Sequence, residues 1–490
     1  MKSNYVKANY DVNQTINFRV LSDHQCEEIY LAALEVLEYT GAVIHSERTL
    51  EILKKGGCWV DGNHVKFPTK VVEAAVRTAP SRIAISDRNG KRAMFLESQN
   101  VYFGPGPSNT YMLDPETGER RRPRVADAAR VAKLCDALPN IDYVMDSGTP
   151  MDVTPTLADV HSFNQMVRNT TKPIIHWGFD EDQYNDIIDM AEVIAGGPEE
   201  LSKNPFFILY SEPSPPLRHS HEAIDKAVAA AKRDIPVIYV PVNFAGGTVP
   251  ATMAGALVCS VADSLVGLVA NQLVRPGSGF IMGGVITAMD MSSTICSYGA
   301  PELSLLSAAL TNVARYIGIP MFSTGGCTDA KMIDAQWAAE AAFSNLLAGL
   351  SGASLVHDCN YMEYGNTGSM DLLTINDEII GMVRRIMKGI KVDDYQMAVD
   401  IIDKVGPGGH FLGEQHTMEN FRKEFWQPKL MNRLRYDEWK ASGAKTMAQR
   451  VNERTREILA NHEVEPLPKS VTDKLDAIIE KAEQREASKR

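Results

Sequence analysis

The 490-residue sequence lacks several features that mark exported or membrane-bound proteins. Residues 1–7 contain no apolar core of the kind that a signal peptide needs. The longest apolar stretch, residues 251–274, is interrupted by polar and acidic residues, which favours a buried helix over a membrane span. The seven cysteines are odd in number and scattered, as is typical of a reducing compartment. We therefore expect a soluble cytoplasmic protein that does not insert into a membrane.

An excess of positive charge is also missing. Lys and Arg number 50 against 62 Asp and Glu, which gives a formal net charge of −12, so we expect no nucleic-acid partner. The sequence has no Gly-x-Ser-x-Gly motif and no glycine spacing of a Walker or dinucleotide-binding loop, which argues against a serine hydrolase or a nucleotide enzyme. Cys327, His357 and Cys359 follow neighbouring predicted strands, but no Cys-x-x-Cys or His-Glu-x-x-His supports a zinc site. We expect no metal on this chain.

The chain does contain a regular alternation of strand-like and helix-like segments from residue 101 onward. The strand-like runs are residues 101–104, 141–146, 173–179, 205–211, 236–244, 279–285, 320–325 and 353–360. Such alternation predicts parallel pairing, and eight pairs match a (β/α)₈ TIM barrel, with a doubly wound open sheet as the alternative. We expect a catalytic barrel over residues 99–390. An N-terminal α/β extension (1–98) precedes it and a C-terminal helical extension (391–490) follows it.

Both extensions carry local signals. Ser22-Asp23 can begin a helix, and Asp61-Gly62 predicts a hairpin within residues 58–67. The C-terminal extension predicts helices at 417–426, 436–440 and 470–490, of which the last is polar and expected to fray. Because no low-complexity linker is present, we expect both extensions to pack on the barrel.

Glycine or polar groups follow each predicted strand, and a barrel would bring these strand ends to one cavity. Strand alternation would place Ile174 on the face of His176, Tyr210 on that of Glu212, and Tyr239 on that of Asn243. Aromatic rings around a cavity suit a quaternary ammonium group, which is held by cation–π attraction of about 0.5–2 kcal/mol, although ordinary core packing explains any single ring equally well. The selected aromatic residues are Tyr102, Trp177, Tyr210, Phe244, Tyr361 and Tyr364, and the selected polar residues are Glu212, Gly325, Gly326 and His357.

Three segments carry a resemblance to a known family. They are Thr-Gly-Gly-Cys-Thr-Asp-Ala-Lys at 324–331, Val-His-Asp-Cys-Asn-Tyr-Met-Glu-Tyr-Gly-Asn-Thr-Gly-Ser at 356–369, and Gly-His-Phe-Leu-Gly-Glu-Gln-His-Thr at 409–417. With them the chain resembles the trimethylamine methyltransferase superfamily, in its members without pyrrolysine. The resemblance implies a TIM barrel. Trimethylamine-specific members carry pyrrolysine just after the seventh strand, where this chain has only ordinary residues at 331–335, so a different amine is implied.

The resemblance implies methyl transfer from a quaternary amine such as glycine betaine, with proline betaine and carnitine as alternatives, to the Co(I) corrinoid (a methylcobamide) of a separate corrinoid protein. A quaternary nitrogen is already cationic and leaves as a neutral tertiary amine, so no general base is needed. We expect a homo-oligomer that binds no cofactor itself, with Cys327 and Lys331 in no covalent role. His357 and the backbone of Gly325-Gly326 would receive the substrate carboxylate, and Glu212 would favour the cation.

Two other functions remain open on the sequence. A barrel lyase or hydrolase could use His357 and Glu212 as acid and base. A non-catalytic protein could bind or sense quaternary amines with the same aromatic residues.

Overall fold

Seven parallel strands form the central sheet of the structure, a computed structural model that describes residues 16–489. The sheet follows chain order, except that the first strand lies beside the last. Its strands, in spatial order, are β6 (Tyr102–Phe103), β17 (Leu355–His357), β16 (Met321–Thr324), β14 (Phe280–Gly283), β12 (Val237–Tyr239), β10 (Phe207–Ser211) and β9 (Ile174–His176). Seven of the eight predicted strands are thus confirmed. Residues 1–7, where no signal peptide is predicted, lie outside the described residues.

The eighth predicted strand, residues 141–146, is not regular. Its one strand-like pairing joins Val144 to Ile174 of β9. Its backbone nevertheless bonds to both edges of the sheet, since the Asp142 N–H donates to the Phe103 carbonyl (2.7 Å) and the Val144 N–H donates to the Pro173 carbonyl (3.0 Å). This segment therefore lies between β6 and β9.

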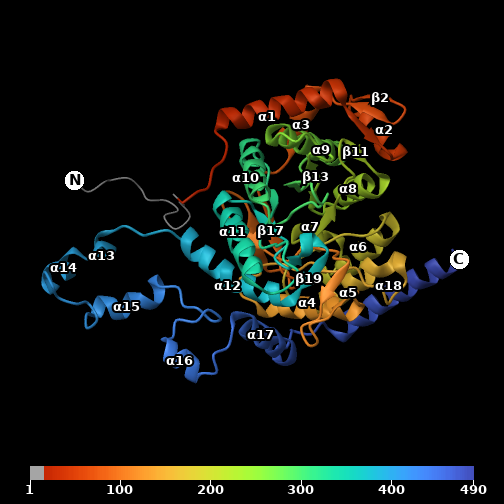
Figure 1. The fold of residues 1–490 in the computed structure, drawn as a ribbon. Coiled ribbons are helices and arrows are strands. Elements are labelled where there is room, and N and C mark those ends of the chain that lie inside the picture. The colour runs from red at the N-terminus through yellow and green to blue at the C-terminus, as the bar shows by residue number, and fades with distance from the viewer. Residues whose placement is uncertain (1–15, 490) are drawn as a thin grey trace.

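Helices follow the strands and cover the sheet (Figure 1). Their bounds are α4 (Val125–Ala137), α5 (Ala158–Asn169), α6 (Glu181–Ala195), α7 (Pro198–Lys203), α8 (His221–Arg233), α9 (Met253–Val274), α10 (Pro301–Tyr316), α11 (Ala335–Ser351) and α12 (Met370–Met387), with a short 3₁₀ turn η2 (Pro155–Leu157) before α5. Helix α9 is the one described helix long and apolar enough to cross a membrane, and 72% of its most apolar window is buried inside the protein. It is a core helix, as expected from the polar residues that interrupt it.

The N-terminal elements pack on this body, with their helices against α8, α9 and α10. They are α1 (Asp23–Glu35), a π-helical turn η1 (Val36–Thr40), β1 (Ala42–Ile44), α2 (Glu47–Lys55), β2 (Trp59–Asp61), β3 (His64–Lys66), α3 (Thr69–Thr78), β4 (Ile83–Ser86) and β5 (Arg92–Leu96). Ser22 caps α1 and β2 pairs with β3, so the predicted helix start and hairpin are confirmed. The β4–β5 hairpin contributes Ile85 and Met94 to the apolar cluster inside the sheet.

That inner cluster shows which residues of each strand face inward. It contains Ile175, Ile208, Tyr210 and Ile238, whereas Ile174 and Tyr239 belong to the outer core under the helices. The alternation predicted for Tyr210 is therefore confirmed. His176 and Asn243 instead face outward, the first toward α5 and the second toward α9.

Short strands extend the structure beyond the C-terminal ends of the main sheet. β13 (Val242–Ala245) pairs in parallel with β15 (Val285–Ala288), while β18 (Tyr361–Met362), β19 (Thr367–Ser369), β7 (Tyr111–Leu113) and β8 (Arg120–Arg121) form a second small sheet. A 3₁₀ turn, η3 (Glu363–Gly365), joins β18 to β19, and β11 (Arg218–His219) pairs with β1. These strands build walls above the central sheet.

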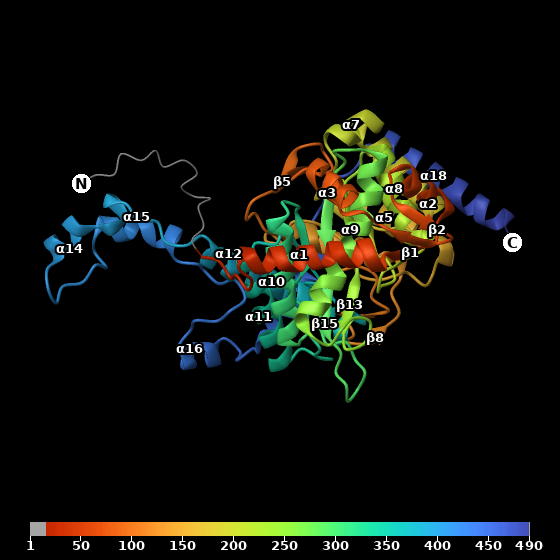
Figure 2. The same cartoon turned by 90° about the horizontal axis from the view of Figure 1, so that it is seen from above.

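The C-terminal region has two different parts. Helices α17 (Met447–Asn461) and α18 (Lys469–Ser488) pack on the body, and Arg485 of α18 bonds to Asp186 of α6 through both guanidinium nitrogens (3.0 and 2.5 Å). The terminal helix expected to fray is therefore anchored. Residues 389–446, called the arm below, contain α13 (Asp394–Met397), α14 (Val399–Val405), α15 (Gln415–Glu424) and α16 (Tyr436–Ala441). These helices stand away from the body in both views, contrary to the expected packing on the barrel (Figures 1 and 2).

Candidate active site

A cavity of about 220 Å³ lies at the C-terminal ends of the central strands. It is bounded by side chains that follow β6, β9, β10 and β17 and by the first residues of β13 and β15. The lining residues are Pro107, Ser108, Trp177, Tyr210, Glu212, Val242, Val285, Tyr298, His357, Tyr361, Tyr364 and Gly365. Strand ends of this kind are where parallel α/β enzymes carry their chemistry.

The structure brings six of the ten selected residues together around this cavity and leaves four elsewhere. The six are Trp177, Tyr210, Glu212, His357, Tyr361 and Tyr364. Tyr102 begins its strand, and its hydroxyl accepts a hydrogen bond from the Phe95 N–H (3.0 Å) at the other end of the sheet. Phe244 lies two residues beyond the lining residue Val242 along β13, so it is past the cavity. Neither ring belongs to the lining.

Gly325 and Gly326 also lie away from the cavity, and their N–H groups are already used. The Gly325 N–H donates to the His357 carbonyl (3.0 Å), and the Gly326 N–H donates to the Ser344 hydroxyl (3.0 Å). Neither donor remains for a substrate carboxylate, which corrects the expected role of this pair.

One aromatic residue of the cavity, Tyr298, was not among the residues selected from the sequence. Tyr298 lies in the long loop between β15 and α10, well past the end of its strand, and its ring centroid is 5.9 Å from that of Tyr361. Asp329 holds this loop, because its carboxylate accepts bonds from the Tyr298 N–H (2.8 Å) and the Ser297 hydroxyl. Asp329 could have pointed to Tyr298 in the sequence only if its contact with the loop of residues 297–298 had been known.

His357 is a neutral imidazole whose free nitrogen is an acceptor. Its Nδ1 lies 2.7 Å from the Ser323 carbonyl, so Nδ1 carries the proton because a carbonyl only accepts. Burial lowers the pKa of His357 to about 4. Nε2 lies 3.3 Å from Oδ1 of Asp358 and has no proton to offer a carboxylate ligand. The expectation that His357 receives the substrate carboxylate therefore does not fit this geometry.

Two acidic side chains give the site its charge. Asp358 is fully buried, and neither of its carboxyl oxygens has a hydrogen-bond partner. Burial raises the pKa of Asp358 well above its usual range, and the charge of Glu212 adds to the rise. Glu212 exposes its side chain to the cavity, where its carboxylate accepts a bond from the Tyr210 hydroxyl (3.1 Å). The surrounding protein raises the pKa of Glu212 as well.

The backbone around Asp358 is built for this close packing. Asp358 adopts a left-handed conformation (φ +75°), which is uncommon for any residue except glycine, asparagine and aspartate. Gly106 lies against it, since a Cβ at this position would come 2.1 Å from Oδ1 of Asp358 and 2.5 Å from the Tyr361 ring. The glycine in the loop after β6 thus makes room for a buried carboxyl group.

Basic side chains stay outside the lining. Among the described residues, none of those that line the cavity is lysine or arginine. Lys226 lies nearby, with its Nζ 5.6 Å from the centroid of the Trp177 ring and bonded to the Gly178 carbonyl (2.5 Å). Burial lowers the pKa of Lys226 to about 8. The lining itself therefore favours a cation over an anion.

The two cysteines near the cavity are ordinary thiols. The Cys327 thiol lies 3.4 Å from the Tyr298 carbonyl, and Cys359 packs against the Gly325 carbonyl. Burial raises the pKa of both thiols well above the usual range, so neither is a ready thiolate. Within residues 16–489, no three His, Cys, Asp or Glu side chains are grouped as a metal site would require.

An outer cleft of about 450 Å³ adjoins the cavity through Tyr364, which lines both. Asp290, Glu302 and Asp329 give it negative charge, and Lys331 is its basic residue. Tyr364 therefore separates or joins the two spaces, and the outer one carries more acidic than basic side chains.

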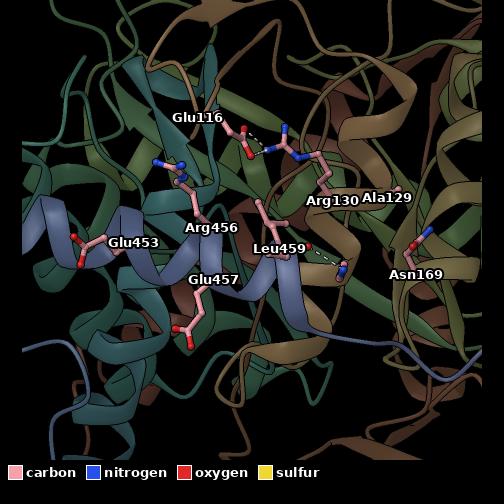
Figure 3. Close-up of a pocket in the computed structure, with 10 residues that line it drawn as sticks. Glu116, Ala129, Arg130, Asn169, Glu453, Arg456, Glu457 and Leu459 are labelled. Atoms are coloured by element: carbon pink, nitrogen blue, oxygen red, sulfur yellow. Dashed lines mark hydrogen bonds and ion pairs between the residues drawn. The ribbon is translucent and has the colours of Figure 1, made fainter.

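A surface cleft of about 850 Å³ lies on the outer helices between α4 and α17 (Figure 3). Two of its basic groups are already paired: Arg130 bonds to Glu116 (2.6 Å), and the Lys133 ammonium donates to the Leu459 carbonyl (2.9 Å). Because it is remote from the strand ends, we do not assign the chemistry to it.

The fold and the site define an α/β enzyme with an acidic, aromatic cavity. The sequence model of the trimethylamine methyltransferase family matches residues 2–487, and the chain belongs to this family.

Named relatives agree with this family. The chain is 33% identical over 464 residues to a trimethylamine methyltransferase of Desulfitobacterium hafniense (strain DSM 10664 / DCB-2), covering 94% of this chain and 93% of the relative. It is 30% identical over 466 residues to the glycine betaine methyltransferase of Desulfitobacterium hafniense (strain Y51), covering 94% and 96%. A trimethylamine methyltransferase of Methanosarcina barkeri (strain Fusaro / DSM 804) is 32% identical over 495 residues, covering 99% of each chain. The chain is therefore a methyltransferase of the methylamine and betaine group.

Among solved structures, the chain is similar to the monomethylamine methyltransferase of Methanosarcina barkeri. The match has 12% identity and a TM-score of 0.46, and it covers 93% of this chain and 97% of the other.

Proposed function

We propose that this enzyme moves a methyl group from a quaternary amine of the glycine betaine class to the Co(I) corrinoid of a separate protein. The observation that carries the proposal is the cavity itself, which combines aromatic walls with the carboxyl group of Glu212 and has no lysine or arginine among its described lining residues. Such a lining favours a cation that cannot hydrogen-bond. The named glycine betaine methyltransferase among the relatives supports the same class.

The cationic end of the substrate would lie among the rings of Trp177, Tyr210, Tyr298 and Tyr361. Each ring face adds cation–π attraction of about 0.5–2 kcal/mol. Glu212 and Asp358 lie close enough to these rings to raise the pKa of Tyr298 and Tyr361, and each would supply negative charge when a bound cation favours its ionised form. These residues hold the ammonium group without taking part in proton transfer, because its nitrogen leaves as a neutral amine.

The carboxylate end needs a donor other than His357. The Ser108 hydroxyl lines the cavity and has no hydrogen-bond partner, whereas the Trp177 indole N–H approaches the buried carboxyl group of Asp146. Unpaired buried donors are costly unless a ligand uses them. We therefore propose Ser108 as the group that receives the carboxylate.

The corrinoid would be carried to the cavity mouth by its own protein, where it supplies a Co(I) nucleophile that takes the methyl group while the electron pair of the N–C bond leaves with the amine. This chain fits such a partner because exposed apolar side chains stand on several loops at the C-terminal ends of the strands. They are Met151, Phe179, Met291 and Met332, and Met253 at the start of α9 is exposed as well. The cavity residues then position and orient the substrate, which is the largest contribution that a site without acid–base groups can make.

We also propose that the central sheet closes into a (β/α)₈ barrel. Residues 141–145 would be the eighth strand, since their backbone bonds to both β6 and β9. In this proposal residues 99–390 form the catalytic barrel, with the extensions 1–98 and 391–490 added to it.

The test is a substrate panel with a reduced corrinoid protein, scored by the absorbance change from Co(I) to methyl-Co(III). Glycine betaine, proline betaine, carnitine and trimethylamine form the panel, and Glu212→Gln serves as a variant with weakened cation binding. We expect at least one quaternary amine to react and trimethylamine not to react. Demethylation of trimethylamine alone would overturn the substrate class, and binding of betaines without any methyl transfer would favour the binding-protein alternative.

A further inference from the structure

Residues 324–331 form one of the three segments that carry the family resemblance, but none of these eight residues lines the aromatic cavity. They end β16 and begin the loop to α11. Cys327, Thr328 and Ala330 are buried, whereas Asp329 is partly exposed and borders the outer cleft. Any effect of this segment on a ligand in the cavity must therefore pass through the residues that the segment contacts.

The segment holds one of the cavity tyrosines by its backbone. The Asp329 carboxylate accepts hydrogen bonds from the Tyr298 N–H (2.8 Å) and from the Ser297 hydroxyl. The Cys327 thiol lies 3.4 Å from the Tyr298 carbonyl. Both peptide groups that flank the Tyr298 side chain are thus in contact with residues 327–329.

The same segment also holds the tyrosine that faces Tyr298. The Thr328 N–H donates to the Tyr361 carbonyl (2.9 Å), and the Glu363 N–H donates to the Ala330 carbonyl (3.1 Å). The rings of Tyr298 and Tyr361 both line the cavity, with centroids 5.9 Å apart and planes inclined by 53°. Residues 327–330 therefore form a bridge between two loops and set the separation of two rings.

Helix α11 supports the bridge from behind. The Glu340 carboxylate accepts bonds from the Thr328 hydroxyl (2.6 Å) and from the Asp329 N–H (2.8 Å). Gly299 lets the Tyr298 loop approach this group, since a Cβ at that position would come 2.4 Å from the carboxyl carbon of Glu340. A continuous set of contacts thus leads from a packed helix through Asp329 to the cavity wall.

We propose that Asp329 is a positioning residue, which sets the affinity of the cavity for a quaternary ammonium group by holding Tyr298 against Tyr361. The inference rests on the proposed function, because it concerns the same aromatic site. Cation–π attraction requires a cation within about 6 Å of the ring centroid. Residues 290–294 of the Tyr298 loop are exposed, so without its anchor the ring would be free to leave the wall.

A direct electrostatic action of Asp329 on the ligand makes a different prediction. Asp329 shares the outer cleft with Glu302, which carries the same charge. If charge alone mattered, Asp329→Asn would lose as much affinity as Asp329→Ala, and Glu302→Gln would weaken binding too. If position matters, Asp329→Asn keeps the ring in place, because the amide oxygen accepts from the Tyr298 N–H and the amide nitrogen can donate to the Ser297 hydroxyl.

Calorimetric titration of tetramethylammonium into the full chain separates these cases. We expect Asp329→Ala to raise the dissociation constant about tenfold, within the range that loss of one ring face allows. Asp329→Asn should stay within about threefold of wild type, and Glu302→Gln, the matched charge control, within about twofold. Circular dichroism and thermal melting check that each variant folds. Should Asp329→Ala fail to fold, Ser297→Ala removes one bond of the same anchor and should raise the constant about threefold.

Two results of this titration would overturn the positioning role. One is an Asp329→Ala variant that binds like wild type, and the other is an equal loss in Asp329→Asn and Asp329→Ala. A wild type that binds no tetramethylammonium would overturn the cation site of the proposed function together with this inference. Binding with the expected pattern but without methyl transfer would contradict the proposed reaction and leave the role of Asp329 intact.

A double-mutant cycle then tests whether Asp329 acts through the ring. Tyr298→Ala removes the ring, so Asp329→Ala combined with Tyr298→Ala should bind tetramethylammonium as weakly as Tyr298→Ala alone. The two losses should therefore not add. If they add fully, Asp329 acts on the ligand independently of Tyr298, and the positioning role is wrong.

Discussion

Asp358 is the residue whose environment is hardest to explain without a ligand. It is fully buried, its two carboxyl oxygens have no hydrogen-bond partners, and Glu212 adds a second acid nearby. The other titratable groups that interact with it are Tyr143, Tyr210, Tyr298, Tyr361, Cys327, Cys359 and His357. None of these groups is cationic at neutral pH, so a bound ammonium group would be the natural counter-charge.

This arrangement predicts that cation binding releases protons. Because the pKa of Asp358 and that of Glu212 are raised in the empty site, a bound cation lowers them by favouring the charged carboxylates. Affinity for tetramethylammonium should therefore rise as pH rises toward the raised pKa values and fall as pH falls. Calorimetry in two buffers of different ionisation enthalpy counts the protons released. Asp358→Asn should release fewer and bind more weakly, while Asn tolerates the left-handed backbone and keeps the fold. An unchanged proton count in this variant would contradict the role given to Asp358.

Ser108 and His357 are predicted to differ in what they recognise. Ser108→Ala should weaken glycine betaine by about 1–3 kcal/mol and leave tetramethylammonium almost unchanged, because the lost donor serves the carboxylate. His357→Ala should weaken both ligands to a similar degree, since its Nδ1 proton is bonded to Ser323 and its Nε2 is an acceptor. Titration of the two ligands on the two variants measures this. A selective loss of glycine betaine in His357→Ala would restore the original assignment of that residue.

Cys327 is predicted to be dispensable for chemistry. Its pKa is raised by burial, and its thiol contacts the carbonyl of Tyr298. Cys327→Ser can keep this contact as a hydroxyl donor, so methyl transfer should stay within about fivefold of wild type, equivalent to about 1 kcal/mol of lost positioning. Single-turnover methyl transfer gives the rate. A folded variant that binds substrate yet transfers no methyl group would require a thiolate mechanism.

At the scale of elements, the sequence predicts the order of strands and helices well because apolar runs and helical periodicity are local properties. Side-chain direction is less local. His176 and Trp177 are adjacent at the end of a short strand. A one-residue shift in the alternation of side chains decides which of the two reaches the cavity. The irregular segment around Val144 does not show by its sequence pattern which of its side chains face the cavity. Tyr210 and Glu212 can be predicted to lie together because one long strand and the residue after it contain both.

Tyr298 and the Gly325-Gly326 pair show a second limit. Tyr298 reaches the cavity from a long loop that Asp329 holds in place, a contact between residues 31 positions apart that no local pattern encodes. Gly325 and Gly326 follow a central strand as predicted, but their N–H groups bond to His357 and Ser344. Position along a strand therefore locates candidates, while hydrogen-bond partners decide whether they are available.

The irregular strand gives a prediction at this scale. The Asp142 carboxylate accepts bonds from the Phe103 N–H (2.7 Å) and from Arg384 of α12 (2.5 Å), which ties residues 141–145 to β6. Asp142→Ala leaves both donors unpaired and should reduce the free energy of unfolding by about 1–3 kcal/mol. Asp142→Asn keeps one acceptor and should cost less. Urea unfolding compares the two. Equal stability of Asp142→Ala and wild type would mean that this contact does not hold the edge strands together.

At the scale of the whole molecule, two apolar surfaces lie at opposite ends of the central sheet. The arm leaves at the N-terminal ends of the strands, whereas Met151, Phe179 and Met332 stand on loops at the C-terminal ends around the cavity. The first surface has no core of its own, while the second consists of separate side chains on loops.

The loop surface should therefore matter for the protein partner and not for the small substrate. Phe179→Ser and Met332→Ser each remove an exposed apolar side chain next to the mouth, and neither residue lines the cavity. Each change should raise the KM for the reduced corrinoid protein about fivefold, equivalent to about 1 kcal/mol of lost contact, and both together should raise it further. Affinity for tetramethylammonium should stay at the wild-type value, because the aromatic rings and the acids are untouched. Leu31→Ser serves as the control for removing an exposed apolar side chain far from the mouth. If the two loop variants change tetramethylammonium affinity but not the KM for the corrinoid protein, these loops shape the substrate site instead, and the partner must approach the cavity from another side.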